Sequence, residues 1–422
     1  MTRPEKFPMS ALALAAAPGA APAPAFTLRF LAWARLAEPE ARADASSALA
    51  RAWLHCGLPP ARREELLVAM TALTDDRDVR VRRALAEALA GEPGAPRALV
   101  VALVNESSAV SEPLLARSPI LSEAELAECA AVGDAVAQCA IARRPALGPA
   151  PAAALAEAGA RVAVAALIGN RGARVGEAAF RRIRERFSAD AEICEALLTS
   201  HEANAALKAE LVIDKALAGA EAGAPSADRD LAERRDAALV RVAADCGPTA
   251  LVEMTRVLRA RGALTMALLL RALLSGERDL FGQALGELAG VSPARAAGLA
   301  RARGEGFAAL LRKAGLPSHA IPAFNGALAA LDARGSGEGD GLRPALISAT
   351  IAACEARKDA ELQPILALLW RFAAEAAKAE ARDLARDAQR AVRSLPPKLT
   401  FSPANDSGRR LLLAAPPEQR VA

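Results

Sequence analysis

Residues 122–145 read SEAELAECAAVGDAVAQCAIARRP and contain one complete pair of predicted helices. Ser122 and Glu125 have the spacing of a capping box, in which two side chains satisfy backbone amides at the start of a helix. Gly133 predicts the end of that helix, in the left-handed conformation that glycine adopts easily. A second helix follows and ends before Pro145, because the residue before a proline disfavours the helical conformation. The stretch therefore predicts a short α-hairpin.

The same apolar pattern returns along the first half of the chain. Similar segments begin at Val110, Val136, Val162 and Ile193, at spacings of 26, 26 and 31 residues, and a break follows each of them. One short hairpin cannot bury its apolar face alone, so successive hairpins must stack and share a core. The pattern predicts an α-solenoid in which the three valines occupy equivalent buried positions. An irregular helical domain with chance periodicity is the alternative.

The composition favours helices throughout the chain. Hydrophobic residues make up 53% of the 422 residues but aromatic residues only 3%, and Tyr is absent. An all-β fold needs β-branched and aromatic residues, whereas Ala, Leu and Arg are strong helix formers. We therefore expect an all-α fold.

The net charge is +4, and 46 of the 53 basic residues are Arg, a bias typical of GC-rich codons. Abundant Arg alone is therefore no sign of nucleic-acid binding.

Several stretches resemble known helical families. The segment 75–89 (DDRDVRVRRALAEAL) resembles the second helix of a HEAT repeat. The runs at 116–126 (ARSPILSEAEL), 141–145 (IARRP), 279–295 (DLFGQALGELAGVSPAR) and 306–317 (GFAALLRKAGLP) resemble the bacterial family of domain of unknown function 2336. This resemblance covers roughly residues 45–335. It implies an all-helical, HEAT-like protein, and it carries over no activity and no functional residue.

The predicted organisation has five parts. They are a disordered Ala/Pro arm at 1–25, HEAT-like helical repeats at 26–215, a joint of small residues at 216–227, a C-terminal helical domain at 228–395 and a disordered tail at 396–422. The first part has one alternative, a signal peptide, because residues 21–23 (Ala-Pro-Ala) are similar to a cleavage site.

The sequence also favours a reducing compartment. No C-x-x-C pair occurs among the six Cys residues, which lie in apolar helical context, so we expect buried reduced thiols. Reduced thiols are typical of the cytoplasm. No run of about 18 strongly apolar residues occurs, so no membrane-spanning helix is predicted.

No catalytic, metal or cofactor site is predicted. His201 and Glu202 lack the second histidine, four positions after the first, that a zinc-protease helix requires. Three isolated histidines cannot form a recognisable metal site. The glycines between positions 335 and 341 have no following Lys-Ser or Lys-Thr pair, so they indicate a flexible loop rather than a phosphate loop. We expect a protein that is not an enzyme and binds no cofactor.

An arginine recurs at the end of each predicted second helix. Arg117, Arg143 with Arg144, and Arg171 would form a ladder along one edge of a solenoid. One interpretation is that each cation stabilises the C-terminus of its own helix, which is worth about 0.3–1 kcal/mol. The other is an edge that binds an acidic peptide or phosphate through guanidinium groups.

The segment 171–186 is a second basic feature. It includes Arg181 and Arg182 and carries a local charge of +4. Phe180, Ile183 and Phe187 have helical spacing and predict the buried stripe, so the arginines should face outward. Two interpretations of this segment remain: a solvated basic face, or a surface that contacts nucleic acid or an acidic partner.

Three functions remain compatible with the sequence. A non-enzymatic scaffold for protein–protein interaction comes first, because solenoids offer extended binding surfaces. A nucleic-acid-binding HEAT-like protein, including a base-excision enzyme, is the alternative, although such an enzyme needs an aromatic-lined basic cleft. A structural module that self-associates is the third.

Overall fold

The computed structural model describes residues 24–220, 225–335, 341–357 and 359–394. Helices and two short 3-10 turns account for the regular structure of these residues, and no strand occurs among them, so the fold is all-α as predicted. The predicted N-terminal arm lies outside the described residues except for 24 and 25, with which the first helix begins. The predicted C-terminal tail lies outside them entirely.

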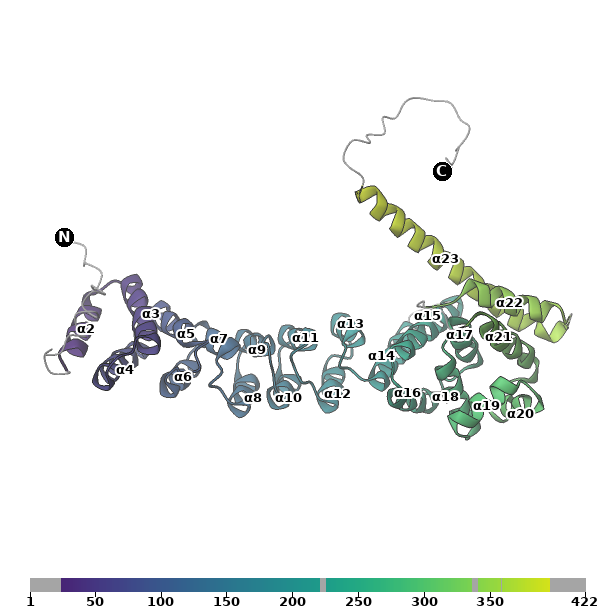
Figure 1. Ribbon diagram of the computed structural model, residues 1–422, viewed down its shortest axis with the longest axis horizontal. Helices are drawn as coiled ribbons and strands as arrows, with labels where there is room; N and C mark the ends of the chain where they lie inside the picture. Colours follow the sequence, from purple (N-terminus) through teal and green to yellow (C-terminus); the bar gives the residue numbers. More distant parts are fainter. Residues whose placement is uncertain (1–23, 221–224, 336–340, 358, 395–422) are drawn as a thin grey trace, which may run out of the picture.

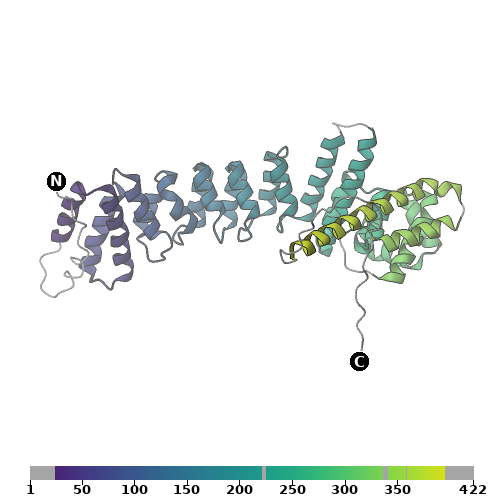
Figure 2. The same cartoon turned by 90° about the horizontal axis from the view of Figure 1, so that it is seen from above.

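The first half of the chain is a double row of short helices. These helices are α2 (Pro24–Leu36), α3 (Pro39–His55), α4 (Pro60–Thr74), α5 (Val79–Leu89), α6 (Arg97–Val104), α7 (Ser108–Arg117), α8 (Glu123–Val132), α9 (Ala135–Ala142), α10 (Pro149–Ala158), α11 (Arg161–Gly169), α12 (Glu177–Arg186) and α13 (Ala191–Thr199). Helices α5, α7, α9, α11 and α13 pack side by side in one layer, and α8, α10 and α12 pack side by side in the other. Figure 1 and Figure 2 show the elongated stack that results, which is the architecture of an α-solenoid.

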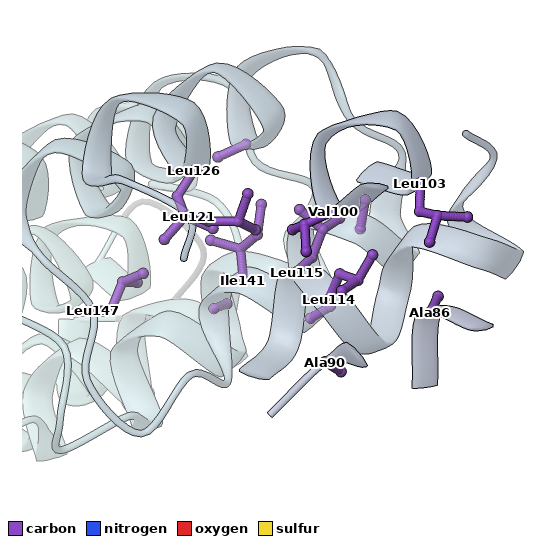
Figure 3. Close-up of a cluster of buried hydrophobic side chains, with 14 of the residues drawn as sticks. Ala86, Ala90, Val100, Leu103, Leu114, Leu115, Leu121, Leu126, Ile141 and Leu147 are labelled. Atoms are coloured by element: carbon purple, nitrogen blue, oxygen red, sulfur yellow. The ribbon is translucent and has the colours of Figure 1, made fainter. Parts of the chain in front are cut away.

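The repeat exists, but its predicted register is wrong. Val110 is fully buried, whereas Val136 and Val162 are 54% and 53% exposed. Asp134 caps α9 and so fixes its first residue at Ala135; Val136 then lies in the first turn, away from the core. The buried positions that correspond between units are Val110 with Leu114, Ala137 with Ile141, Ala163 with Leu167, and Ile193 with Leu197. Figure 3 shows Leu114, Ile141 and their neighbours between the layers.

The helix ends are partly as predicted. Ser122 and Glu125 form both hydrogen bonds of the capping box. Gly133, in contrast, is not left-handed: its φ is −68° and its ψ is 157°. An extended residue is needed there because α9 begins immediately after Asp134. Glycine is needed for another reason, since a Cβ at this position would lie 2.5 Å from the carbonyl oxygen of Cys129.

The second half of the chain folds around a second core. Its helices are α14 (Ala205–Ala220), α15 (Pro225–Ala244), α16 (Pro248–Ala260), α17 (Met266–Ser275), α18 (Arg278–Ala289), α19 (Pro293–Ala302), α20 (Glu305–Lys313), α21 (Ile321–Arg334), α22 (Pro344–Glu355) and α23 (Gln363–Ser394), with 3-10 turns η1 (Ser318–Ala320) and η2 (Ala360–Leu362). Helices α14 to α22 gather at one end of the stack, and α23 extends beyond them (Figure 1).

The two cores meet along α14. Leu207 and Leu211 of this helix belong to the first core, and Ala209 and Val212 belong to the second. The predicted joint at 216–227 is therefore not the boundary between the cores. Most of its residues belong to α14 and α15, and residues 221–224 lie outside the described part of the chain.

Two substitutions five residues apart, on different sides of α9, test the observed register. Ile141 is fully buried, so Ile141→Ala should lower the free energy of unfolding by about 2–5 kcal/mol. Val136→Ala, the matched control on the exposed side of the same helix, should change it by less than about 0.5 kcal/mol. Urea denaturation followed by circular dichroism measures both. Similar losses in the two variants would contradict the register.

Candidate functional site

Three of the predicted ladder arginines form a row of exposed cations. Arg117 is the last residue of α7, Arg143 is the C-cap of α9, and Arg171 follows the C-cap of α11. These three helices are neighbours in one layer, so their C-termini lie along the same edge of the stack (Figure 1). All three side chains are exposed, and none has a hydrogen-bonded or ion-paired partner among the described residues. We call Arg117, Arg143 and Arg171 the arginine row.

Arg144 has a different role from its neighbour Arg143. Its Nη1 donates to the carbonyl oxygen of Leu115 at 2.6 Å, and its Nη2 donates to that of Ser118 at 2.7 Å. These carbonyls lie at the C-terminus of α7, where no intrahelical amide can bond them. Arg144 therefore satisfies the end of the preceding unit's helix, not of its own. Burial lowers the pKa of its guanidinium.

Asn170 repeats this connection one unit further on. Its Nδ2 donates to the carbonyl oxygens of Ala142 and Arg144, at 2.7 Å each. Next to it, the amide of Leu147 donates to the carbonyl of Gly172 at 3.0 Å. A Cβ on Gly172 would lie only 1.9 Å from the carbonyl oxygen of Pro145, so the two loops approach as closely as glycine permits. The loops that carry the arginine row are thus bonded to one another.

A small hollow lies beside the last arginine of the row. It has a volume of ≈ 250 Å³ and is lined by Arg171, Ile168, Phe180, His201 and Glu202, among others. The carboxylate of Glu202 accepts from the amide of Val175 at 3.2 Å, which connects the loops on either side. The sequence analysis missed this hollow. Its one signal was the position of His201, which follows the C-cap of α13 as Arg171 follows the C-cap of α11.

The basic face of α12 is largely neutralised. Arg181 pairs with Glu177 at 2.6 Å, and Arg182 pairs with Glu157 of α10 at 2.7 Å. Arg184 contacts two carboxylates of α14. Arg186 donates to the carbonyls of Ala156 and Gly159, at the end of α10, as Arg144 does at the end of α7. Arg181 and Arg182 lie on a different helix layer from the arginine row and do not join it.

The six thiols are unpaired, and most are shielded. Cys56 is exposed, contrary to prediction, while Cys354 is buried and the other four are partly buried. Burial raises the pKa values of Cys129, Cys194, Cys246 and Cys354, which reduces their thiolate fraction.

Among the described residues, no three His, Cys, Asp or Glu side chains gather as a metal would require. In the same part of the chain, no helix combines the length and the apolar character that crossing a bilayer demands.

These features define a helical-repeat protein with a bonded loop edge. The chain belongs to the bacterial family of domain of unknown function 2336, described as an uncharacterised protein conserved in bacteria, which it matches over residues 110–347. The matched region begins in α7 and ends in α22, so it includes the arginine row but not α23. No curated protein and no protein of solved structure matches the chain.

Substitutions at the adjacent arginines separate the two roles. Arg144→Ala leaves two carbonyls at the end of α7 without a donor, which should cost about 1–3 kcal/mol in the free energy of unfolding. Arg143→Ala removes an exposed, unpaired side chain and should change it by less than about 0.5 kcal/mol. Thermal and urea denaturation of both variants provide the measurement. A larger loss in the free energy of unfolding for Arg143→Ala than for Arg144→Ala would refute the roles assigned to the two arginines.

A pH dependence follows from a carboxylate that joins two units. Arg161 bonds Asp190 at 2.5 Å, and Asp190 also accepts from the amides of Glu192 and Ile193. The Arg161 hydrogen bond, followed by the amide bonds, lowers the pKa of Asp190 below 3.8. A lowered folded-state pKa stabilises the protein above the ordinary pKa, and this stabilisation is lost as the pH falls through the folded value.

Asp190→Asn should therefore be less stable than the native protein at pH 7, and the difference should shrink as the pH approaches 3. Urea midpoints of both proteins across this range give the comparison. A difference that stays constant or grows toward low pH would show that Asp190 is not stabilised as a carboxylate.

Proposed function

We propose that this protein is a non-enzymatic scaffold that binds an acidic segment of a partner protein along the arginine row. The observation that carries the proposal is the contrast among the arginines of this edge. Arg144 is used within the fold, whereas Arg117, Arg143 and Arg171 are exposed without a partner in the described chain. Their loops are already bonded to one another, so little backbone conformational entropy is lost when a ligand binds.

The geometry suggests the form of the ligand. Packed helices lie about 8–10 Å apart, so successive arginines of the row are separated by about 10 Å. A polyproline II segment has three residues per turn and advances about 3.1 Å per residue, so carboxylates at every third residue share one face at about the spacing of the row. Each guanidinium offers a fork of donors that suits a carboxylate. The hollow beside Arg171 is large enough for one aliphatic side chain of the same segment.

The remaining features support a binding role over the alternatives. The raised thiol pKa values disfavour cysteine nucleophiles. The ion pairs of Arg181 and Arg182 leave α12 with little charge to offer to phosphates. Six unpaired cysteines are consistent with a reducing compartment, and on this ground we propose that the protein acts in the cytoplasm.

A peptide-binding experiment tests the row directly. The probe is a fluorescent Pro-rich peptide that favours polyproline II, with Glu at every third position and a C-terminal Leu, and binding is followed by anisotropy. Arg117→Glu, Arg143→Glu and Arg171→Glu combined should weaken binding about tenfold or more, since each exposed pair contributes up to about 1 kcal/mol. The matched control reverses three exposed, unpaired cations far from the row, Arg295, Arg312 and Lys313.

The outcomes distinguish the candidate functions. Equal loss in the control variant, or equal binding of a peptide whose Glu residues are clustered, would contradict the proposed row. A single-stranded oligonucleotide serves as the competing probe. If it binds more tightly than the peptide, and Arg181→Glu with Arg182→Glu abolishes that binding, the nucleic-acid function replaces the scaffold.

A further inference from the structure

A second surface lies at the other end of the molecule, in a groove between α15 and α23. The groove has a volume of ≈ 510 Å³. Small residues, including Ala237 of α15 and Ala374 of α23, lie along it, and long charged side chains border it. We call it the α15–α23 groove. Small residues of this kind allow the backbone of a third helix to approach closely.

The groove carries an excess of unpaired positive charge. Two of its carboxylates are already used, because Glu233 pairs with Arg371 at 3.0 Å and Glu375 binds Arg271. The remaining cations are exposed and have no partner among the described residues; they are Arg234, Arg241, Lys378 and Arg382. Asp230 is the one carboxylate of the groove that stays unpaired within the same part of the chain.

Helix α23 extends the groove into an exposed apolar seam. Trp370, Ala374, Ala377, Ala381, Leu384 and Ala388 follow one another at spacings of four and three residues. This alternation is that of a coiled-coil helix. The two large members are mostly exposed, Trp370 at 55% and Leu384 at 65%, and every described residue from 377 to 390 is exposed. Figure 1 shows this part of α23 leaving the body of the protein.

The base of α23 is firmly held, so the seam has a fixed position. Arg271, of which only 2% is exposed, donates from both Nη atoms to Glu375, at 2.8 and 2.6 Å. Its guanidinium also lies 4.6 Å from the ring centroid of Phe372. In contrast, a projecting helix without tertiary contacts is only marginally stable in water. A partner that covers the seam would supply those contacts.

The charges identify the kind of helix that fits. The basic residues Arg371, Lys378 and Arg382 lie on the side of the seam that faces the groove, and Glu380 and Asp387 lie on its other side. Two antiparallel copies of α23 would place like charges opposite each other, which disfavours self-association. The residues after 394 carry four basic and two acidic side chains, so they do not complement the groove either.

We propose that the α15–α23 groove and the seam of α23 together bind an amphipathic helix of another protein, with an acidic flank toward the groove. The apolar face of that helix packs on Trp370, Ala377 and Leu384. Its carboxylates pair with Arg234, Arg241 and Lys378. This site is separate from the arginine row and does not depend on the function proposed for it.

The test uses the full chain and a designed helical peptide. The peptide is about three heptads long, with Leu at the a and d positions, Glu along one flank and Gln along the other. A matched peptide carries Lys in place of Glu. Anisotropy should show at least tenfold tighter binding of the Glu peptide, with an affinity that falls as salt rises.

Variants locate the binding. Arg234→Glu with Arg241→Glu should weaken binding of the Glu peptide at least tenfold, and so should Leu384→Asp, which changes an exposed residue and leaves the fold intact. Arg312→Glu with Lys313→Glu, a matched charge reversal on α20, should leave the affinity unchanged, as should the triple substitution of the arginine row. The last variant separates this site from the proposed function.

Three outcomes would overturn the proposal. One is equal binding of the Glu and Lys peptides. Another is unchanged affinity in both the Arg234/Arg241 and the Leu384 variants. The third is a dimer, detected by light scattering, that Leu384→Asp converts to a monomer, because the seam would then be occupied by a second copy of the chain.

Discussion

The stack of the first half depends on hydrogen bonds that several units donate to the open carbonyl ends of their neighbours. Arg144 satisfies the end of α7 and Arg186 the end of α10, while Asn170 bonds the end of α9 and the loop that follows it. Buried Gln138 adds a further link, since it donates to the carbonyl of Ala130 and accepts from the amide of Ala160. Helices of eight to ten residues leave a large share of their carbonyls without partners. Stacking therefore buries apolar surface and completes the backbone hydrogen bonds at the same time.

Because stacking must both bury apolar surface and complete backbone hydrogen bonds, only some parts of the fold could be predicted from the sequence. Helix content, the capping box at Ser122 and the repeat itself are local properties, and they were predicted from the sequence. The register was not, because alanine and valine alternate in these helices and either can be taken as the buried residue. A shift of one position turns a side chain by about 100° around the helix. Asp134 fixes the start of α9 and so decides that Ala137, and not Val136, faces the core.

The candidate sites also depend on packing that the local sequence does not determine. Arg143 and Arg144 are chemically identical neighbours, and only the position of the preceding loop makes one an internal donor and leaves the other exposed. The α15–α23 groove brings Arg234 close to Lys378, which is more than a hundred residues away along the chain. No local pattern can predict such a pair. The heptad spacing in α23 was not identified in the sequence analysis, and the exposure of this helix depends on where α22 and α17 hold its base.

Arginine therefore has three physical states in this protein: it bonds carbonyls inside the fold, it pairs with carboxylates on the surface, or it stays exposed without a partner. Neither the amino-acid composition nor the net charge of +4 tells which arginines are in which state. Unpaired cations that share one edge or one groove repel one another, and the fold gains nothing from holding them together. A ligand with carboxylates at matching positions removes that repulsion, whereas a neutral ligand does not. The argument applies most strongly to the arginine row and the α15–α23 groove. The backbone of the row is held by its own hydrogen bonds, and that of the groove is held by the ion pair between buried Arg271 and partly exposed Glu375.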